Sequence, residues 1–181
     1  FILKCSPVAD HMPERSEVFE DLLQPVISSL GISLSTQQVR QLTFHYNLLM
    51  QWNQKMNLSA IRDPVSIVQR HFGEALFLAK SLPNVKGTLV DVGSGAGFPG
   101  APIAVYRPNL HVTLVEAKRK KAIFLREVAR ERQNLLVLNA RIEMLEQHFD
   151  WVTMRAVSSA LLLRCLRELA PNLALLVTDQ V

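Results

Sequence analysis

A glycine-rich loop constrains the fold of this chain more than any other segment. It reads Asp91-Val-Gly-Ser-Gly-Ala-Gly-Phe-Pro-Gly100 and directly follows a short apolar run, Thr88–Val92. A stretch with helical spacing of apolar residues begins near Pro102. Alternate glycines let the backbone turn sharply and approach a ligand closely. In a doubly wound sheet such a loop lies at the carboxyl end of the first strand, where ligands bind.

The rest of the second half alternates between strand and helix patterns. Four more short apolar runs predict strands at His111–Val115, Leu135–Leu138, Trp151–Met154 and Leu173–Val177. Helical patterns at about Pro102–Val105, Arg119–Arg132 and Ser159–Leu169 separate them. Strands that alternate with helices indicate a parallel sheet covered on both faces. The predicted fold is therefore α/β, with a doubly wound, mostly parallel sheet.

The first half predicts a helical arm. Helices are expected over Ser16–Leu30, from a cap at Ser35 or Thr36 through Trp52, and from Asp63-Pro64 toward Leu82. We therefore divide the chain into an irregular tail (1–15), an arm (16–82) and an α/β domain (83–181). Phe1 is no natural start, Met12 is the expected one, and we leave the tail out of the functional reasoning.

Composition excludes several classes of protein. At 181 residues and 49% hydrophobic, the chain is long enough for a core without disulfide or metal. Its apolar runs fall far short of the ~20 residues that span a membrane. Cys5 and Cys165 make no framework, and the five histidines make no zinc pattern. We expect a monomer in the cytoplasm, with no metal and no membrane contact.

Positive charge is concentrated in one stretch. Seven basic and two acidic residues lie between Lys118 and Arg132, so this stretch carries +5 while the whole chain carries +4. Such a patch attracts the phosphates of nucleic acid. The alternative is a solvated helix face whose long side chains cover apolar neighbours.

The loop predicts a ligand without phosphates. Gly95–Gly100 matches the GxGxxG dinucleotide pattern, but in the wrong register after the strand. Pro99 and Pro102 remove N–H donors that a pyrophosphate would need. S-adenosylmethionine has no phosphate, and Asp91 is expected to meet the ammonium of its amino-acid tail. A nicotinamide dinucleotide is the competing ligand.

Two further segments are expected at the same edge of the sheet. Glu116 ends the second strand ~20 residues past the loop, where an acid holds ribose hydroxyls; the alternative is an ion pair with Lys118–Lys121. After the third strand, Ile142 is expected to pack on an adenine and Glu143 to read its edge. The alternative there is a solvated helix over Ile142–Gln147.

Several segments together resemble one family, the bacterial ribosomal small-subunit methyltransferase G family, also called glucose-inhibited division protein B. The resemblance covers about Gly31 to Ala156. Its motifs are Trp52-Asn-Gln-Lys-Met-Asn-Leu-Ser59, Arg70-His-Phe-Gly-Glu74, the glycine loop with Pro102, Val115-Glu-Ala-Lys-Arg-Lys-Lys121, Phe124-Leu-Arg126, Ala140-Arg-Ile-Glu143, Phe149-Asp150 and Arg155-Ala156.

The resemblance implies a Rossmann-like class I methyltransferase that moves a methyl group from S-adenosylmethionine to N7 of a guanine in 16S rRNA, leaving S-adenosylhomocysteine. Its partner would be that RNA or the small ribosomal subunit. Carried over from the family, cofactor contacts would fall on Gly93, Phe98, Ile142, Glu143 and Arg155. Glu116 sits at the usual ribose position of the fold, and Asp91, Gly95 and Gly97 of the loop are further candidates for cofactor contact. RNA contacts would fall on Lys118, Arg119, Lys120, Lys121 and Arg126.

Guanine N7 carries a lone pair and no proton, so we expect no general base. Arg155 is expected to orient the reaction by binding the cofactor carboxylate or guanine O6. The alternative is a structural pair with Asp150 or Glu143. His71 and Glu74, one turn apart, are expected to form a helix-to-sheet contact rather than to line the pocket. Trp52 is expected in the core.

The chain departs from the family pattern at two places. Glu74 and Ala75 stand where the family usually has Asp and Ser, which puts any hydrogen bond there in question. Pro171-Asn-Leu173 lacks the usual glycine-rich turn, so we expect a truncated carboxyl end or missing stretches near residues 133 and 172. Two alternatives to the rRNA enzyme stay open: a methyltransferase of this fold for another substrate, and a non-catalytic RNA-binding module.

Overall fold

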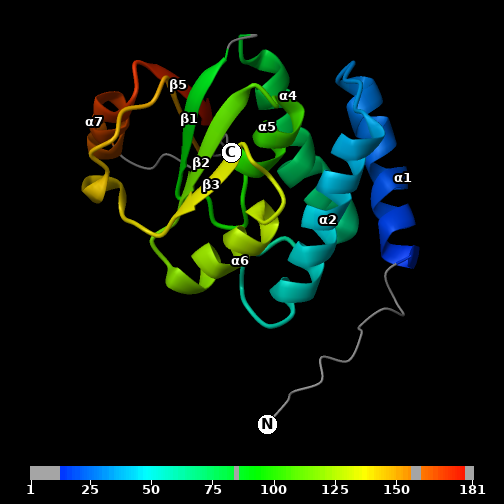
Figure 1. Ribbon diagram of the computed structural model, residues 1–181. Helices are drawn as coiled ribbons and strands as arrows, with labels where there is room; N and C mark the ends of the chain where they lie inside the picture. Colours follow the sequence, from blue (N-terminus) through cyan, green and yellow to red (C-terminus); the bar gives the residue numbers. More distant parts are fainter. Residues whose placement is uncertain (1–12, 84–85, 156–159, 178–181) are drawn as a thin grey trace.

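Five parallel strands form the centre of the molecule, in the order β3-β2-β1-β4-β5. The computed structural model describes residues 13–83, 86–155 and 160–177 (Figure 1). The strands are β1 (Gly87–Val92), β2 (Leu110–Val115), β3 (Leu135–Leu138), β4 (Trp151–Arg155) and β5 (Asn172–Leu176). The predicted α/β fold with a parallel sheet is confirmed, and each predicted strand is present within one residue at either end.

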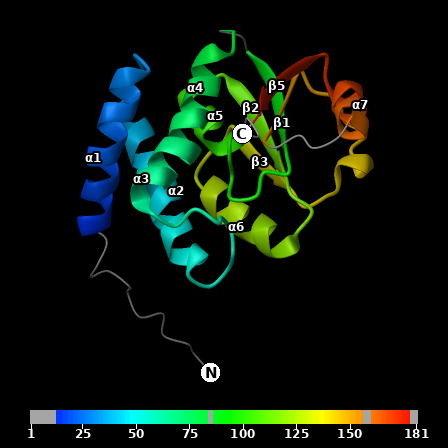
Figure 2. The same cartoon turned by 180° about the vertical axis from the view of Figure 1, so that it is seen from behind.

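Helices flank the sheet on both sides. In the α/β part they are α5 (Gly100–Tyr106), α6 (Arg119–Ala129) and α7 (Ala160–Leu169), with a 3₁₀ turn, η2 (Ile142–Met144), before β4. The arm consists of α1 (Pro13–Ser29), α2 (Thr36–Asn53), α3 (Pro64–Ile67), the π-helical segment η1 (Val68–Gly73) and α4 (Glu74–Ser81). Figures 1 and 2 show the arm and α7 at opposite sides of the sheet.

Alternating side chains of the strands build two separate cores. Leu89 and Leu114 point into a large cluster that includes α5, α6 and the arm. Their neighbours Val90 and Val115 point into a smaller cluster with Leu166 and Leu169 of α7. Because successive strand residues face opposite sides, one stretch of apolar sequence can serve both cores.

The arm shares the larger core with the sheet. Phe72 of η1 is fully buried, with its ring centroid 4.9 Å from that of Phe19 in α1 and 5.0 Å from that of Phe98 in the glycine loop. Polar contacts reinforce this packing. Gln38 completes the capping box of α2 with Ser35, and its Nε2 also donates to the Val105 carbonyl of α5 at 2.9 Å. The expected boundary near residue 83 therefore does not divide the hydrophobic core.

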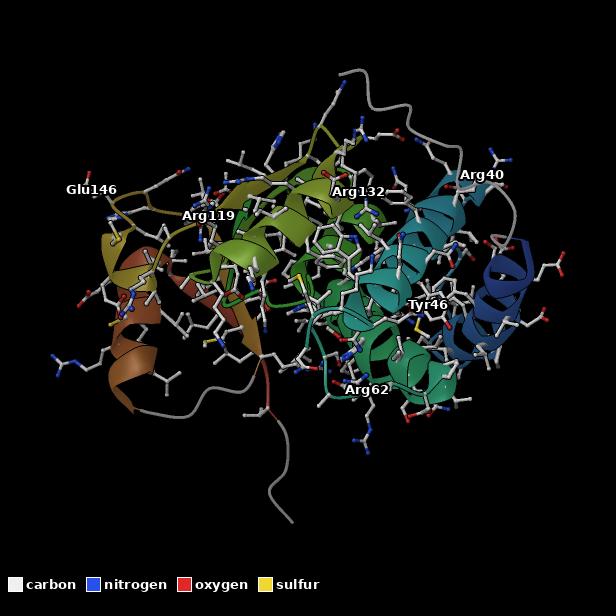
Figure 3. All side chains as sticks on the ribbon, turned by 90° about the horizontal axis from the view of Figure 1, so that it is seen from below. Arg40, Tyr46, Arg62, Arg119, Arg132 and Glu146 are labelled. Atoms are coloured by element: carbon white, nitrogen blue, oxygen red, sulfur yellow. The ribbon has the colours of Figure 1, made fainter. Side chains whose placement is uncertain are left out.

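Two predicted helices differ from the structure. The third arm helix contains a π-helical segment, and α6 ends at Ala129 instead of Arg132. Beyond α6, Arg132 is 8% exposed and its Nη2 donates to the Gln41 carbonyl at 2.7 Å, so it lies against α2 and outside the solvated basic surface (Figure 3). The helix considered as an alternative over Ile142–Gln147 does not form, since the structure has only η2 there. The irregular tail predicted over 1–15 is wrong for residues 13–15, which begin α1. Residues 1–12, Ala156 and Ser159 lie outside the described residues.

We expect Phe72→Ala to lower the free energy of unfolding by about 3–5 kcal/mol, because it opens a cavity where the arm meets the loop. Phe77→Ala is the matched control, since Phe77 lies in α4, which directly follows η1, and is 54% exposed. Its effect on the free energy of unfolding should stay below about 1 kcal/mol. Urea unfolding followed by the fluorescence of Trp52 and Trp151 measures both. Equal effects of the two variants would contradict the shared core.

Candidate functional site

A cavity of about 260 Å³ opens at the carboxyl ends of the central strands. This is the edge where doubly wound sheets bind ligands. Its lining comes from the ends of β1, β2 and β4 and from the segment after β3: Val92, Gly93, Val115, Glu116, Ala117, Ala140, Arg141, Ile142, Glu143 and Met154. The structure thus brings together four of the predicted cofactor residues, Gly93, Glu116, Ile142 and Glu143.

The glycine loop satisfies most of its own N–H groups. Gly93 and Ser94 donate to the Val115 carbonyl, and Gly97 and Phe98 donate to the Ser94 carbonyl. Gly95 donates to the Glu116 carboxylate at 3.0 Å. A dinucleotide loop offers such donors to a pyrophosphate. Because these donors are already used, the loop suits a ligand without phosphates.

Two glycines of the loop are required by close packing. Gly97 has φ +89°, and a Cβ atom there would lie 3.2 Å from the ring of His45. At Gly100 a Cβ atom would lie 2.4 Å from Leu114 and 2.7 Å from Asp91. Gly97 and Gly100 are therefore structural parts of the loop, and neither Gly95 nor Gly97 lines the cavity.

Asp91 supports the loop from beneath. Its side chain is 0% exposed, and Oδ2 accepts the Gly100 N–H at 3.0 Å. Burial raises the pKa of this carboxyl to about 7, while the Gly100 hydrogen bond opposes the shift. The carboxyl is buried, faces Gly100 at the start of α5 and does not line the cavity, and its contact with an ammonium group stays a prediction.

Glu116 joins the loop to the start of α6. Oε2 accepts the Gly95 N–H at 3.0 Å, and Oε1 accepts the Lys118 N–H at 2.7 Å. The alternative of an ion pair with Lys118–Lys121 is not what the structure contains. Two backbone donors instead fix the carboxylate at the cavity wall. Each oxygen keeps a second acceptor position for hydroxyl groups of a ligand.

Glu143 is an exposed acid in the cavity wall, one residue from the half-buried Ile142. The 3₁₀ turn η2 places both beside Ala140 and opposite Met154 of β4. An apolar side chain next to a free carboxylate can pack on the face of a ring and accept hydrogen bonds from its edge. Whether they contact adenine stays a prediction.

Phe98 lies between two histidine rings of the arm. Its centroid is 4.7 Å from that of His45 and 4.7 Å from that of His71, with interplanar angles of 15° and 16°. His45 also approaches the Ala96 carbonyl with Nε2 at 2.8 Å. Phe98 is 6% exposed and does not line the cavity. Its role in the structure is to attach the loop to the arm.

Arg155 ends β4 and binds the arm. Its guanidinium contacts the Glu74 carboxylate and the Arg70 carbonyl, and Nη1 lies 2.7 Å from His71 Nδ1. The pair predicted as the alternative, with Asp150 or Glu143, is wrong. The expected helix-to-sheet contact of His71 and Glu74 is confirmed, and Glu74 retains the acidic contact despite its departure from the family pattern.

Ser59 completes this network. His71 Nε2 lies 2.7 Å from Ser59 Oγ, and the Asn53 side chain accepts the N–H groups of Leu58 and Ser59. Since Arg155 can only donate, Nδ1 of His71 must accept and Nε2 must donate to Ser59. Arg155 therefore fixes the tautomer of His71, and the WN-x3-NLS motif places the Ser59 hydroxyl that accepts from Nε2.

The basic residues divide into two groups. Lys118–Lys121 line a second cavity, of about 480 Å³, together with Lys55, Met56 and Asn57 of the arm. Arg126 is exposed on α6, and Arg130 pairs with Glu127. Sequence reasoning missed Lys55 and His45. A lone lysine in an arm loop gives no signal, and His45 stands in an otherwise ordinary helix.

Two classes of site have no support in the part of the chain that the structure describes. No group of three or more His, Cys, Asp or Glu side chains there could hold a metal ion. Within residues 13–83, 86–155 and 160–177, no helix combines the length and the apolar character of a membrane span.

Comparison of the sequence with models of protein families identifies the family of this chain. The model of rRNA small subunit methyltransferase G matches residues 38–172. The chain belongs to this family. Proteins named ribosomal RNA small subunit methyltransferase G include one from Chloroflexus aggregans, 40% identical over 83% of this chain and 66% of its own, and one from Roseiflexus castenholzii, 38% identical over 76% and 62%. The chain thus spans less than two thirds of the length of these two relatives.

Solved methyltransferases share the fold of this family member. A putative RNA methyltransferase from Pyrococcus horikoshii is 19% identical, with TM-score 0.52 over 68% of this chain and 65% of its own. Coclaurine N-methyltransferase is 14% identical, with TM-score 0.52 over 86% and 56%. At these identities the likeness shows the Rossmann-like methyltransferase fold alone.

The buried histidines predict how stability depends on pH. Burial lowers the pKa of His45 to about 3 and that of His71 to about 4, with the charges of Arg132 and Arg155 adding to the shifts. Between about pH 4 and pH 6.5 the two histidines are therefore protonated in the unfolded chain and neutral in the folded protein. Asp91 opposes this difference by one proton, because its carboxyl is protonated only in the folded protein. The net excess of one proton makes the free energy of unfolding rise with pH by about 1.4 kcal/mol per unit in this window.

Urea unfolding across this pH range measures the slope. His45→Gln keeps a donor for Ala96 and should flatten it, whereas His111→Gln, at an exposed histidine, should leave it unchanged. A free energy of unfolding that is constant or rises as pH falls would contradict neutral, buried histidines.

Proposed function

We propose that the chain transfers a methyl group from S-adenosylmethionine to N7 of a guanine in 16S rRNA. One observation carries the proposal: the glycine loop uses its N–H groups internally and borders a cavity walled by Glu116 and Glu143. Membership of the rRNA small subunit methyltransferase G family supports the reaction and the acceptor.

The residues present fit this methyl donor. Its adenosine and amino-acid parts carry no phosphate, in agreement with a loop that has few free donors. Glu116 would accept hydrogen bonds from the ribose hydroxyls, Ile142 would pack on the adenine, and Glu143 would accept from its amino group. When bound, the donor supplies an electrophilic methyl group on a sulfonium centre.

The remaining predicted residues would act through the loop. Gly93 lines the cavity, and Gly95, Gly97 and Phe98 keep the loop in its path. Asp91 would fix the end of the loop at Gly100. These roles replace some of the direct contacts that the resemblance implied.

The chemistry requires positioning and no proton transfer by the protein. Guanine N7 has an in-plane lone pair and no proton, so no side chain has to act as a base. Arg155 would act as an orienting residue at the rim between β4 and the arm, where Glu74 and His71 hold its guanidinium. Positioning and exclusion of water can supply much of the rate in such a reaction.

The exposed basic side chains would contact the RNA. We assign this role to Lys118, Arg119, Lys120, Lys121 and Arg126, which would bind phosphates and set the register without reading the sequence. The target base would have to leave its stack to reach the cavity. We further propose that the arm (16–82) and the methyltransferase part (83–181) act as one unit, since they share the larger hydrophobic core.

Transfer of labelled methyl groups tests the proposal. Purified chain, labelled S-adenosylmethionine and small ribosomal subunits lacking 7-methylguanosine should yield that nucleoside in digested 16S rRNA. Glu143→Gln should weaken binding of S-adenosylhomocysteine, measured by calorimetry, about tenfold because a charged hydrogen bond is lost. Glu146→Gln is the matched control, an exposed acid that does not line the cavity (Figure 3).

Other outcomes would contradict the proposal in distinct ways. Binding of S-adenosylhomocysteine without label in any RNA would favour another substrate. RNA binding without any affinity for this ligand would favour a non-catalytic module, and binding of a nicotinamide dinucleotide instead would revive the dinucleotide interpretation.

A further inference from the structure

A basic cleft lies between the arm and the α/β part. We call it the arm–α6 cleft and define it by Lys55, Met56 and Asn57 on one side and Lys118–Lys121 on the other. It encloses about 480 Å³. Its two walls are far apart in the sequence, and the docking of α2 on α6 brings them together.

The cations that line this cleft form no ion pair among the described residues. Among the described residues the ion pairs are Glu127–Arg130 and Glu74–Arg155, so none of the five cationic side chains of the cleft has an acidic partner. Asn57 is also oriented by a cation, since Arg62 Nη2 donates to its Oδ1 at 3.1 Å. Like charges gathered in one hollow repel one another, and a bound anion removes that repulsion.

The first turn of α6 carries the opposite charge to the one a helix start favours. Lys118 is the N-cap and forms no side-chain cap, and the first turn contains no acid, while Glu116, two residues before the cap, accepts the Lys118 N–H at 2.7 Å. Cations at a helix N-terminus oppose the macrodipole, while an anion there is stabilised. Lys118–Lys121 at the start of α6 and Lys55 of the arm therefore favour the same kind of ligand, an anion.

The arm–α6 cleft adjoins the methyl-donor cavity. Ala117 lines that cavity and Lys118 lines the cleft. In addition, Lys121 Nζ lies 4.0 Å from the point where a Cβ atom of Gly95 would stand. A polymer held in the cleft would therefore pass beside the glycine loop.

We propose that the arm–α6 cleft binds a backbone phosphodiester of the RNA substrate between Lys55 of the arm and Lys118–Lys121 of α6. This inference rests on the proposed function for the identity of the polymer. The arm then contributes directly to substrate binding, and its docking on α6 creates the phosphate site.

Binding of fluorescently labelled oligouridylate, followed by anisotropy over a series of salt concentrations, tests the site. Oligouridylate presents phosphodiesters and no guanine. We expect Lys55→Gln to weaken binding several-fold and to reduce the slope of log affinity against log salt by about 0.7, the value for one phosphate contact with a single strand.

Lys86→Gln is the matched control. It removes the same charge from an exposed lysine just before β1. That lysine lies at the amino ends of the strands, whereas the cleft lies near their carboxyl ends. It should leave the salt slope unchanged. Calorimetry with S-adenosylhomocysteine on both variants checks that each is folded with an intact cavity.

Equal effects of the two substitutions, or no binding of oligouridylate by the unaltered chain, would contradict a phosphodiester site in the arm–α6 cleft. Competition by inorganic phosphate at the same strength as by the polymer would overturn it too, since the site would then bind a free anion. Methyl transfer that persists in those cases keeps the proposed function. If the unaltered chain transfers no methyl group, but Lys55→Gln still weakens oligouridylate binding, the proposed function is refuted and the phosphate site in the cleft stands.

Discussion

The stack of Phe98 between His45 and His71 is the contact on which the site depends. It joins the middle of the glycine loop to two arm segments, α2 and η1, with centroid distances of 4.7 Å on both faces. Both histidines must be neutral to lie there, and burial lowers the pKa of each. From the other side, Asp91 and Glu116 hold the loop by the N–H groups of Gly100 and Gly95. The loop is thus held by contacts within the protein, and we expect it to form before any ligand binds.

This arrangement separates charges according to what each surface would bind. Glu116 and Glu143 give the donor cavity an acidic wall, suited to the hydroxyls, amino groups and positive charge of S-adenosylmethionine. The arm–α6 cleft is cationic and suited to phosphodiesters. Only Ala117 separates Glu116 from Lys118 in the chain, so the boundary between the two is sharp. Arg155, between β4 and the arm, is neutralised by Glu74 and adds no free charge to either surface.

The strands of the sheet could be predicted because the spacing of apolar residues and the turn and cap residues between elements are local properties of the sequence. Five apolar runs, the glycine loop and the caps at Ser35 and Asp63 all appear where expected. The partners of Arg155 and the place of Phe98 depend on how the arm docks, which one sequence does not contain. The burial of Asp91 against α5 could not be predicted either. For the same reason the basic stretch could not be divided from the sequence. Arg132 packs against α2 of the arm, whereas Lys118–Lys121 line the arm–α6 cleft.

Amide hydrogen exchange of the ligand-free protein tests most directly whether the arm forms the loop in advance. The N–H groups of Gly97, Phe98 and Gly100 are hydrogen-bonded within the loop. They should exchange as slowly as the core strands, and Phe98→Ala should accelerate them strongly while β2 stays protected. Exchange of these amides at the rate of an open peptide in the unaltered, ligand-free chain would contradict a preformed loop and would make the ligand the agent that orders it.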